Sequence, residues 1–250
     1  MRNAAEDTTL RFQNPGQWPK ILPELTEEQE RIRDDFHGVW LTELPKRYSI
    51  VEDFNHRYPL RSLKDVGTPI RTLDIGAGRG EHLEYEDLSS QEYVALELRD
   101  SLAKRIREKF PLAKTIVGDI QQRLDVPDGY FNRILAIHVL EHLPNLPKAL
   151  DEVQRMLAPN GRFSVLIPCD PGLAYEIARN ISAKRIFVQK YKTNYDWYID
   201  SEHINMPSEI IDQLQQRFEI TNQTYFPLAL PVVPLNLIIG LTLRHRHNQE

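Results

Sequence analysis

The chain has 250 residues, of which 41% are hydrophobic and 27% are charged, and its formal net charge is −5. This composition is typical of a globular chain with one sizeable core, and it argues against a disordered chain or a broad basic surface for nucleic acid. Cys169 is the only cysteine, so no intrachain disulfide can form. Because the N-terminus lacks a charged-then-apolar signal pattern, we expect a cytoplasmic protein.

The first elements along the chain are predicted to be helical. Residues 1–18 are polar, and Thr26 with Gln29 then forms a capping-box pattern. Apolar residues follow at the spacing of a helix, at Ile32, Phe36 and Val39. A second segment, residues 47–58, precedes the first predicted strand.

Three glycines follow the first strand. Residues 72–81 read Thr-Leu-Asp-Ile-Gly-Ala-Gly-Arg-Gly-Glu, with glycines at 76, 78 and 80. Glycines let the backbone turn sharply and approach a ligand closely, and we expect a helix to begin directly after them. The dinucleotide fingerprint G-x-G-x-x-G needs a further glycine where Glu81 stands, which disfavours a nicotinamide oxidoreductase.

Polar side chains end the next three predicted strands. Residues 93–97 end at Glu97, residues 115–120 present Asp119 and Ile120, and the fourth strand ends at His138. Helical periodicity over residues 102–110 and 146–157 predicts crossover helices. Since parallel strands joined in this way present their carboxyl ends at one edge, these side chains are expected to meet in one crevice.

Three later strands complete the predicted sheet, at residues 162–167, 218–225 and 235–243. A turn at residues 158–161 leads into the first of these strands. A proline-rich reversal, residues 227–234, joins the last two and makes a membrane span over residues 226–243 improbable. The reversal is apolar enough to cover a hydrophobic substrate or to face a membrane surface, although packing on the sheet is the simpler interpretation.

The order D-x-G-x-G-x-G, followed by strand-end acids, resembles the class I S-adenosylmethionine-dependent methyltransferases. The resemblance implies an α/β fold, a Rossmann-like doubly wound sheet of seven strands with the last antiparallel. Glu97 is then expected to bind the ribose hydroxyls and Asp119 the adenine amino group. The implied cofactor-binding set is Asp74, Gly76, Gly78, Gly80, Glu97, Asp119, Ile120 and His138. Asn132 departs from the aspartate that usually follows the phenylalanine at the start of the fourth strand.

The same resemblance suggests how the rest of the chain is organised. Residues 1–66 are interpreted as an N-terminal tail and a helical cap over the cofactor crevice, and residues 67–250 as the methyltransferase domain. Residues 171–208, rich in aromatic and basic side chains, form a substrate-side insertion. The expected substrate-binding residues are His56, Tyr58, Tyr195, Trp197, Glu202 and Asn205.

Three histidines are candidate catalytic bases: His138 first, then His203 and His142. His138 to His142 also matches the H-x-x-E-H zinc pattern. That pattern needs both histidines on one helix, whereas His138 is predicted to end a strand and no defined third ligand follows. We therefore expect no metal.

The predicted function is methyl transfer from S-adenosylmethionine to a small or carrier-linked acceptor, at oxygen or else at nitrogen. The expected partner is a small-molecule, glycan-linked or lipid-linked substrate. A non-catalytic S-adenosylmethionine-binding regulator is the first alternative, and a nicotinamide-dependent oxidoreductase is the second. Nucleic acid is not an expected partner, and no transmembrane segment is predicted. Contact with a membrane surface stays open, as does the oligomeric state.

Overall fold

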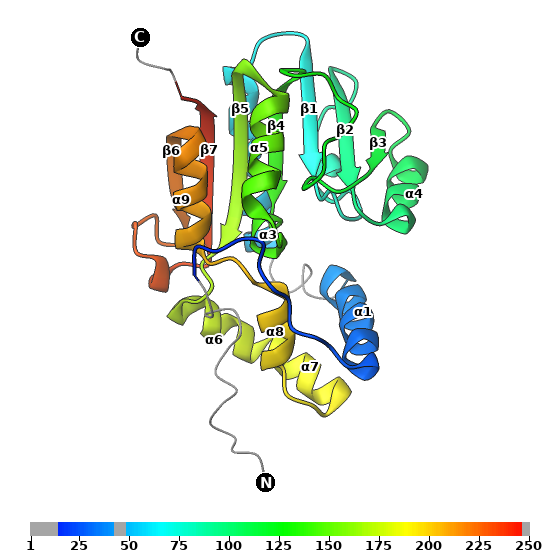
Figure 1. The fold of residues 1–250 in the computed structure, drawn as a ribbon, viewed down its shortest axis with the longest axis vertical. Helices are drawn as coiled ribbons and strands as arrows, with labels where there is room; N and C mark the ends of the chain where they lie inside the picture. The colour runs from blue at the N-terminus through cyan, green and yellow to red at the C-terminus, as the bar shows by residue number, and fades with distance from the viewer. Residues whose placement is uncertain (1–14, 43–48, 247–250) are drawn as a thin grey trace.

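A computed structural model describes residues 15–42 and 49–246 of the chain (Figure 1). Its centre is a seven-stranded sheet with the order β3-β2-β1-β4-β5-β7-β6. The strands are β1 Ile70–Ile75, β2 Gln91–Glu97, β3 Lys114–Val117, β4 Phe131–Ile137, β5 Leu157–Pro168, β6 Phe218–Phe226 and β7 Ile238–His245.

The strand pairing confirms the predicted fold class. Strands β1 to β5 pair in parallel, whereas β7 lies antiparallel between β5 and β6. The central strands read as apolar runs because helices and loops cover the sheet, and Leu73, Ile134 and Val165 are fully buried.

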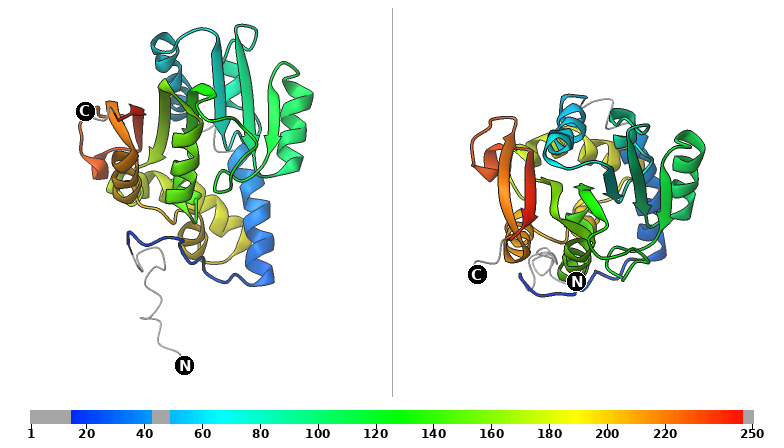
Figure 2. Two further views of the ribbon diagram at one scale, coloured as in Figure 1. Left: turned by 45° about the horizontal axis from the view of Figure 1, so that its top comes forward. Right: turned by 90° about the horizontal axis from the view of Figure 1, so that it is seen from above.

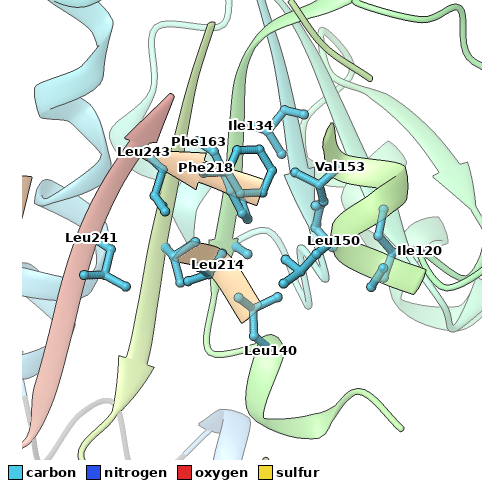
Figure 3. Packing of buried hydrophobic residues seen from close by; sticks show 14 of the residues in the cluster. Ile120, Ile134, Leu140, Leu150, Val153, Phe163, Leu214, Phe218, Leu241 and Leu243 are labelled. Carbon is cyan, nitrogen blue, oxygen red and sulfur yellow. The ribbon is translucent and has the colours of Figure 1, made fainter. Parts of the chain in front are cut away.

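Two helices cover one face of the sheet. Helix α5 (Leu146–Met156) and helix α9 (Pro207–Arg217) contact each other and contribute Leu150, Val153 and Leu214 to the main hydrophobic core (Figure 3). The predicted crossover helix between β2 and β3 is α4 (Asp100–Lys109). The short helices α3 (Ser49–Arg57) and η2 (Pro59–Asp65) precede β1.

The helix expected directly after the glycine loop is only a single 3-10 turn, η3 (His82–Tyr85). Two features end it early. Glu86 forms a buried ion pair with Arg133 (2.7 Å) and contacts His82 Nε2 (2.7 Å), and a turn at Asp87 then leads into β2. Burial opposes the charge on Glu86, yet its contacts with His82 and Arg133 lower the pKa of the carboxyl group to about 2.

Asn132, the departure from the usual aspartate, has a structural role. Its side chain accepts a hydrogen bond from Arg71 N (2.8 Å) and donates to the carbonyls of Gly67 and Pro69 (both 2.8 Å). An amide can both donate and accept, so it ties the start of β4 to the segment that leads into β1.

The later strands differ from prediction in two places. The expected turn at 158–161 lies within an irregular β5, where the register with β4 shifts between Phe131 and Arg133. Strand β7 begins three residues later than expected, because Val233–Leu235 form the 3-10 helix η5. The buried Asn236 side chain donates to the carbonyls of Leu230 and Val232, which holds the reversal in a curled conformation.

The capping-box prediction at the first helix is confirmed. Helix α1 (Glu27–Thr42) begins after Thr26, whose Oγ1 accepts from Gln29 N (3.2 Å), while Gln29 Oε1 accepts from Thr26 N (2.9 Å). Residues 47 and 48 of the second predicted segment lie outside the described residues.

Helix α1 and the insertion form one cap at the carboxyl ends of the strands (Figures 1 and 2). The insertion contains α6 (Leu173–Ile181), α7 (Ala183–Tyr191) and α8 (Asp196–Glu202). Fully buried Phe36 of α1 packs edge-on against Phe187 (5.0 Å between ring centroids) and Tyr198 (5.1 Å). A hydrophobic cluster separate from the sheet core therefore joins two regions that are far apart in the sequence.

Among the described residues, no helix is both long and apolar enough to cross a bilayer.

Candidate active site

A cavity of about 780 Å³ lies between the carboxyl ends of the strands and the cap. On one side it is lined by the loop that follows β1, where Gly76 and Gly78 have φ angles of 65° and 59°. A side chain at Gly76 would place its Cβ 2.6 Å from Val139 Cγ2, so the loop can follow this path only with glycine there.

The two strand-end acids also line the cavity. Glu97 is buried, and its two carboxylate oxygens accept hydrogen bonds from Gly78 N (3.0 Å) and Arg99 N (3.0 Å). Asp119 Oδ1 accepts from Gln121 N (2.9 Å), and buried Ile120 lies beside it. Each carboxylate oxygen can accept more than one hydrogen bond, so both acids keep capacity for a ligand.

Asp74 and Gly80 mainly shape the glycine loop. Buried Asp74 accepts a hydrogen bond from Tyr93 OH (2.9 Å), and burial raises the pKa of its carboxyl group to about 7. Gly80 is not among the lining residues, and its φ of 85° and the packing of Phe110 against it exclude a side chain there.

Three histidines and a glutamate line the opposite end of the cavity, near the short helix η4 (Leu140–His142). His138 adopts a left-handed backbone conformation (φ 53°), which is uncommon outside glycine and recurs at functional sites. Its Nδ1 lies 3.3 Å from Glu141 Oε1, and its Nε2 lies 3.1 Å from Asn55 Oδ1. Burial opposes the charge on Glu141, but His138 and the neighbouring histidines lower the pKa of its carboxyl group.

His203 is held by an acid at the end of β5. Its Nδ1 lies 2.7 Å from Asp170 Oδ2, and Asp170 also accepts a hydrogen bond from Arg179 Nη1 (3.0 Å). Burial lowers the pKa of the His203 imidazole, although the hydrogen bond to Asp170 acts in the opposite direction. His142 Nδ1 donates to the backbone carbonyl of Glu202 (2.7 Å), because a carbonyl can only accept.

Known proteins resemble this chain in sequence. A family described as "Methyltransferase domain" matches residues 73–165. The ubiquinone/menaquinone biosynthesis C-methyltransferase UbiE of Serratia proteamaculans is 26% identical over 84% of this chain and 90% of its own length. The chain is an S-adenosylmethionine-dependent methyltransferase, and residues 73–165 carry its methyltransferase domain. S-adenosylmethionine is therefore its cofactor.

Solved structures share the fold of this methyltransferase. A TehB-like methyltransferase from Corynebacterium glutamicum has a TM-score of 0.58 at 13% identity and covers 87% of this chain and 100% of its own. A Burkholderia thailandensis N1-methyltransferase with bound S-adenosylhomocysteine has a TM-score of 0.57 at 16% identity, with 91% and 94% covered. At these identities the likeness concerns the fold alone.

A further relative bears on the acceptor atom. The sterol 4-C-methyltransferase strm-1 of Caenorhabditis elegans is 31% identical, over 40% of this chain and 32% of its own length. This relative and UbiE are both named for methylation of carbon. The oxygen or nitrogen acceptor predicted from the sequence gains no support from them.

The structure of the methyltransferase brings most of the predicted site residues to the cavity. These are Asp74, Gly76, Gly78, Glu97, Asp119, Ile120, His138, His142, His56, Glu202 and His203.

Four predicted substrate-binding residues lie outside the cavity lining. Tyr58 OH contacts Asn222 Oδ1 (3.1 Å), and Tyr195 and Trp197 pack in the aromatic cluster of the cap. Asn205 donates to the carbonyls of Leu140 and Leu143, so it fixes the loop after β4. Their side chains are engaged in the fold, which favours structural roles.

Sequence reasoning gave no separate role to Glu141, Asp170 or Tyr175. Asp170 follows Cys169 just beyond the end of β5 at Pro168, so the strand-end rule that identified Glu97 and Asp119 could have found it. Tyr175 lines the cavity from α6, and only the tertiary placement of that helix shows this.

Proposed function

We propose that this methyltransferase adds a methyl group to a carbon of a partly apolar small molecule, beside an ionisable hydroxyl group of that molecule. One observation carries the proposal. A single cavity runs from the glycine loop and the strand-end acids to the histidine cluster, so cofactor and acceptor can lie end to end. The carbon acceptor is supported by the two relatives named for carbon methylation.

The cofactor end fits S-adenosylmethionine. We assign Glu97 to the two ribose hydroxyls and Asp119 to the adenine amino group, because both acids face the cavity and retain acceptor capacity. Gly78 leaves space for the ligand beside the loop. When bound, the cofactor supplies an electrophilic methyl group on its sulfonium.

The acceptor end supplies orientation and hydrogen-bond acceptors. Since the Nδ1 atoms of His142 and His203 are occupied by Glu202 O and Asp170, their Nε2 atoms are left to accept a hydrogen bond from the acceptor hydroxyl. A hydroxyl polarised in this way raises electron density on the adjacent unsaturated carbon. That carbon then bonds to the methyl group, whose bond to the sulfonium sulfur breaks with the electron pair left on the sulfur. The proton that the acceptor carbon loses passes to one of these two Nε2 atoms.

Apolar side chains around this end suit the carbon skeleton of the acceptor. Val139, Ile199 and Ile238 line the cavity, and Tyr175 contributes its ring. Holding the acceptor carbon in line with the methyl group is the main catalytic requirement, because the electrophile is already activated.

An acceptor screen tests the proposal. The protein is incubated with S-adenosylmethionine labelled with ¹³C in the methyl group and with matched phenols, enols and amines, and NMR and mass spectrometry locate the label. We expect a new carbon-bound methyl on a phenolic or enolic acceptor. Label found only on oxygen or nitrogen would overturn the carbon assignment, and labelling of amines alone would overturn the hydroxyl requirement.

A further inference from the structure

We propose that Glu141, His142 and His203 bind a divalent transition-metal ion of the Zn²⁺ class at the acceptor end of the cavity. Each of the three residues offers one ligand atom, and these atoms all lie within 4.8 Å of one another. Two tetrahedral ligands on Zn²⁺ are about 3.3 Å apart, so small side-chain rotations bring the set to bonding distance.

The backbone holds the two ligand segments together. Glu141 and His142 lie in η4, whereas His203 follows α8 at the end of the insertion. Ile204 N and Asn205 N both donate to Glu141 O (2.9 and 3.1 Å), and the Asn205 side chain donates to two further carbonyls of the same loop. The three ligands therefore sit on a fixed scaffold.

His142 and His203 each make, through Nδ1, the kind of hydrogen bond that metal-binding histidines make. Metal-binding histidines usually donate their second ring N–H to a carboxylate or a backbone carbonyl, which fixes the tautomer. His203 Nδ1 pairs with fully buried Asp170 (2.7 Å), and His142 Nδ1 donates to Glu202 O (2.7 Å). Both Nε2 lone pairs are thereby left for the ion.

The carboxylate of Glu141 gives a second, independent indication. The residue is only 2% exposed, and among the described residues its buried Oε2 atom has no hydrogen-bond partner. A buried carboxylate oxygen without a partner is costly, so such atoms point to a ligand. Its Oε1 atom lies 3.9 Å from His142 Nε2.

The donor set selects the class of ion. Two imidazole nitrogens with one carboxylate oxygen suit Zn²⁺, Co²⁺ or a similar ion better than Mg²⁺ or Ca²⁺, which prefer oxygen ligands. Three protein ligands leave an open position, as in catalytic zinc sites. The H-x-x-E-H pattern pairs His142 with His138, whereas the folded chain brings His142 next to His203, which is distant in the sequence.

With the ion bound, the Nε2 lone pairs are used by the metal, and its open position, in place of these two atoms, would hold the acceptor oxygen. This part of the inference rests on the proposed function. Binding of the ion itself needs neither acceptor nor cofactor. The two proposals can therefore fail separately.

Metal titration of the chelator-treated, gel-filtered protein tests the site. Isothermal calorimetry with Zn²⁺ should give one ion per chain, and Co²⁺ should give a visible absorption band. His142→Ala should weaken Zn²⁺ binding at least about 10-fold, and since the His142 side chain is 36% exposed, this variant should fold. Asp170→Asn, behind His203, should weaken binding by about 10-fold to 100-fold.

His245→Ala is the matched control, because this imidazole contacts Leu157 O at the far end of β7, away from the cavity lining. It should bind Zn²⁺ like the parent. Binding of S-adenosylhomocysteine by every variant confirms that the fold is intact. Absence of stoichiometric Zn²⁺ binding by the parent, or equal binding by the parent and His142→Ala, would overturn the site.

Discussion

The two ends of the cavity are built in different ways. The cofactor end consists of backbone and acids that follow β1, β2 and β3, one short motif for each strand. The acceptor end is assembled from η4, helix α3 and the segment after α8. A motif that binds through local backbone geometry can be recognised in the sequence, whereas a cluster gathered from distant segments exists only in the folded chain.

The chemistry of the two ends differs as well. Positive-φ glycines and strand-end acids offer a shaped surface with hydrogen-bond acceptors at the cofactor end. At the acceptor end, imidazoles are oriented by buried acids and by a backbone carbonyl. Substitutions at the cofactor end should therefore affect cofactor affinity, and substitutions at the acceptor end should affect turnover.

The largest expected effect is loss of cofactor binding in Gly78→Val. The φ of 59° is strained for a β-branched residue, and the new side chain would place its Cβ 3.4 Å from Glu81 Oε2 on the cavity lining. Calorimetry with S-adenosylhomocysteine should show at least about 100-fold weaker binding, on the order of 3 kcal/mol. Gly129→Val is the control, with a similar φ of 64° and no crowding. Equal affinity losses in both variants would mean that backbone strain, rather than the cavity, explains the result.

The two strand-end acids, Glu97 and Asp119, should contribute unequally to cofactor affinity. Glu97→Ala removes an ionised acceptor for two hydroxyls and should cost roughly 1.5–3 kcal/mol of cofactor binding, whereas Asp119→Asn should cost about 1 kcal/mol. Glu92→Ala, on the same strand as Glu97 but paired with Lys114 away from the cavity, should leave affinity unchanged. Measured dissociation constants that rank Asp119→Asn as the weaker binder would reverse our assignment.

At the acceptor end, turnover should fall without loss of cofactor affinity. His203→Ala and His138→Ala should each lower kcat at least about 10-fold while S-adenosylhomocysteine binds within about 2-fold of the parent. The physical reason in the first variant is loss of the His203 Nε2 atom, which orients the acceptor. In the second it is loss of the His138 ring, which holds Glu141 and Asn55 beside the cavity. His245→Ala should keep the parent rate. If both cavity variants turned over normally, neither histidine would contact the acceptor.

The last expected effect concerns the stability of the fold rather than cofactor binding or turnover. Because the folded pKa of Asp74 is about 7, above its ordinary value of 3.8, the native state binds more protons than the unfolded state between these pH values. The free energy of unfolding should therefore fall as pH rises from about 4 to 7. Asp74→Asn should remove this slope, because an amide does not titrate in this window.

Urea unfolding at pH 5 and pH 8 measures this difference between parent and variant. Asp87 is the contrast, because its hydrogen bonds with Ser89 lower the pKa of its exposed carboxyl group. Asp87→Asn should show the same small change at both pH values. A parent protein as stable at pH 8 as at pH 5 would contradict a neutral, buried Asp74.

The sequence by itself determined the sheet and the cofactor end. Alternating apolar runs and helical periods predicted the strands and crossover helices, and the spacing of Asp74, Gly78, Glu97 and Asp119 predicted their meeting at one edge. These features depend on local backbone preference and on the fixed geometry of parallel strands. Both are properties of short segments, so they can be read without knowing the rest of the fold.

Only the tertiary structure decided how the cap and the acceptor end are assembled. Phe36 packs with Phe187, and His142 meets His203, because long-range packing and the backbone hydrogen bonds to Glu141 O join these segments. Tyr58 and Tyr195 are of a residue type common in substrate sites, yet both side chains are buried in the fold. No local pattern encodes such contacts, since their free energy comes from surfaces that meet only after the chain has folded.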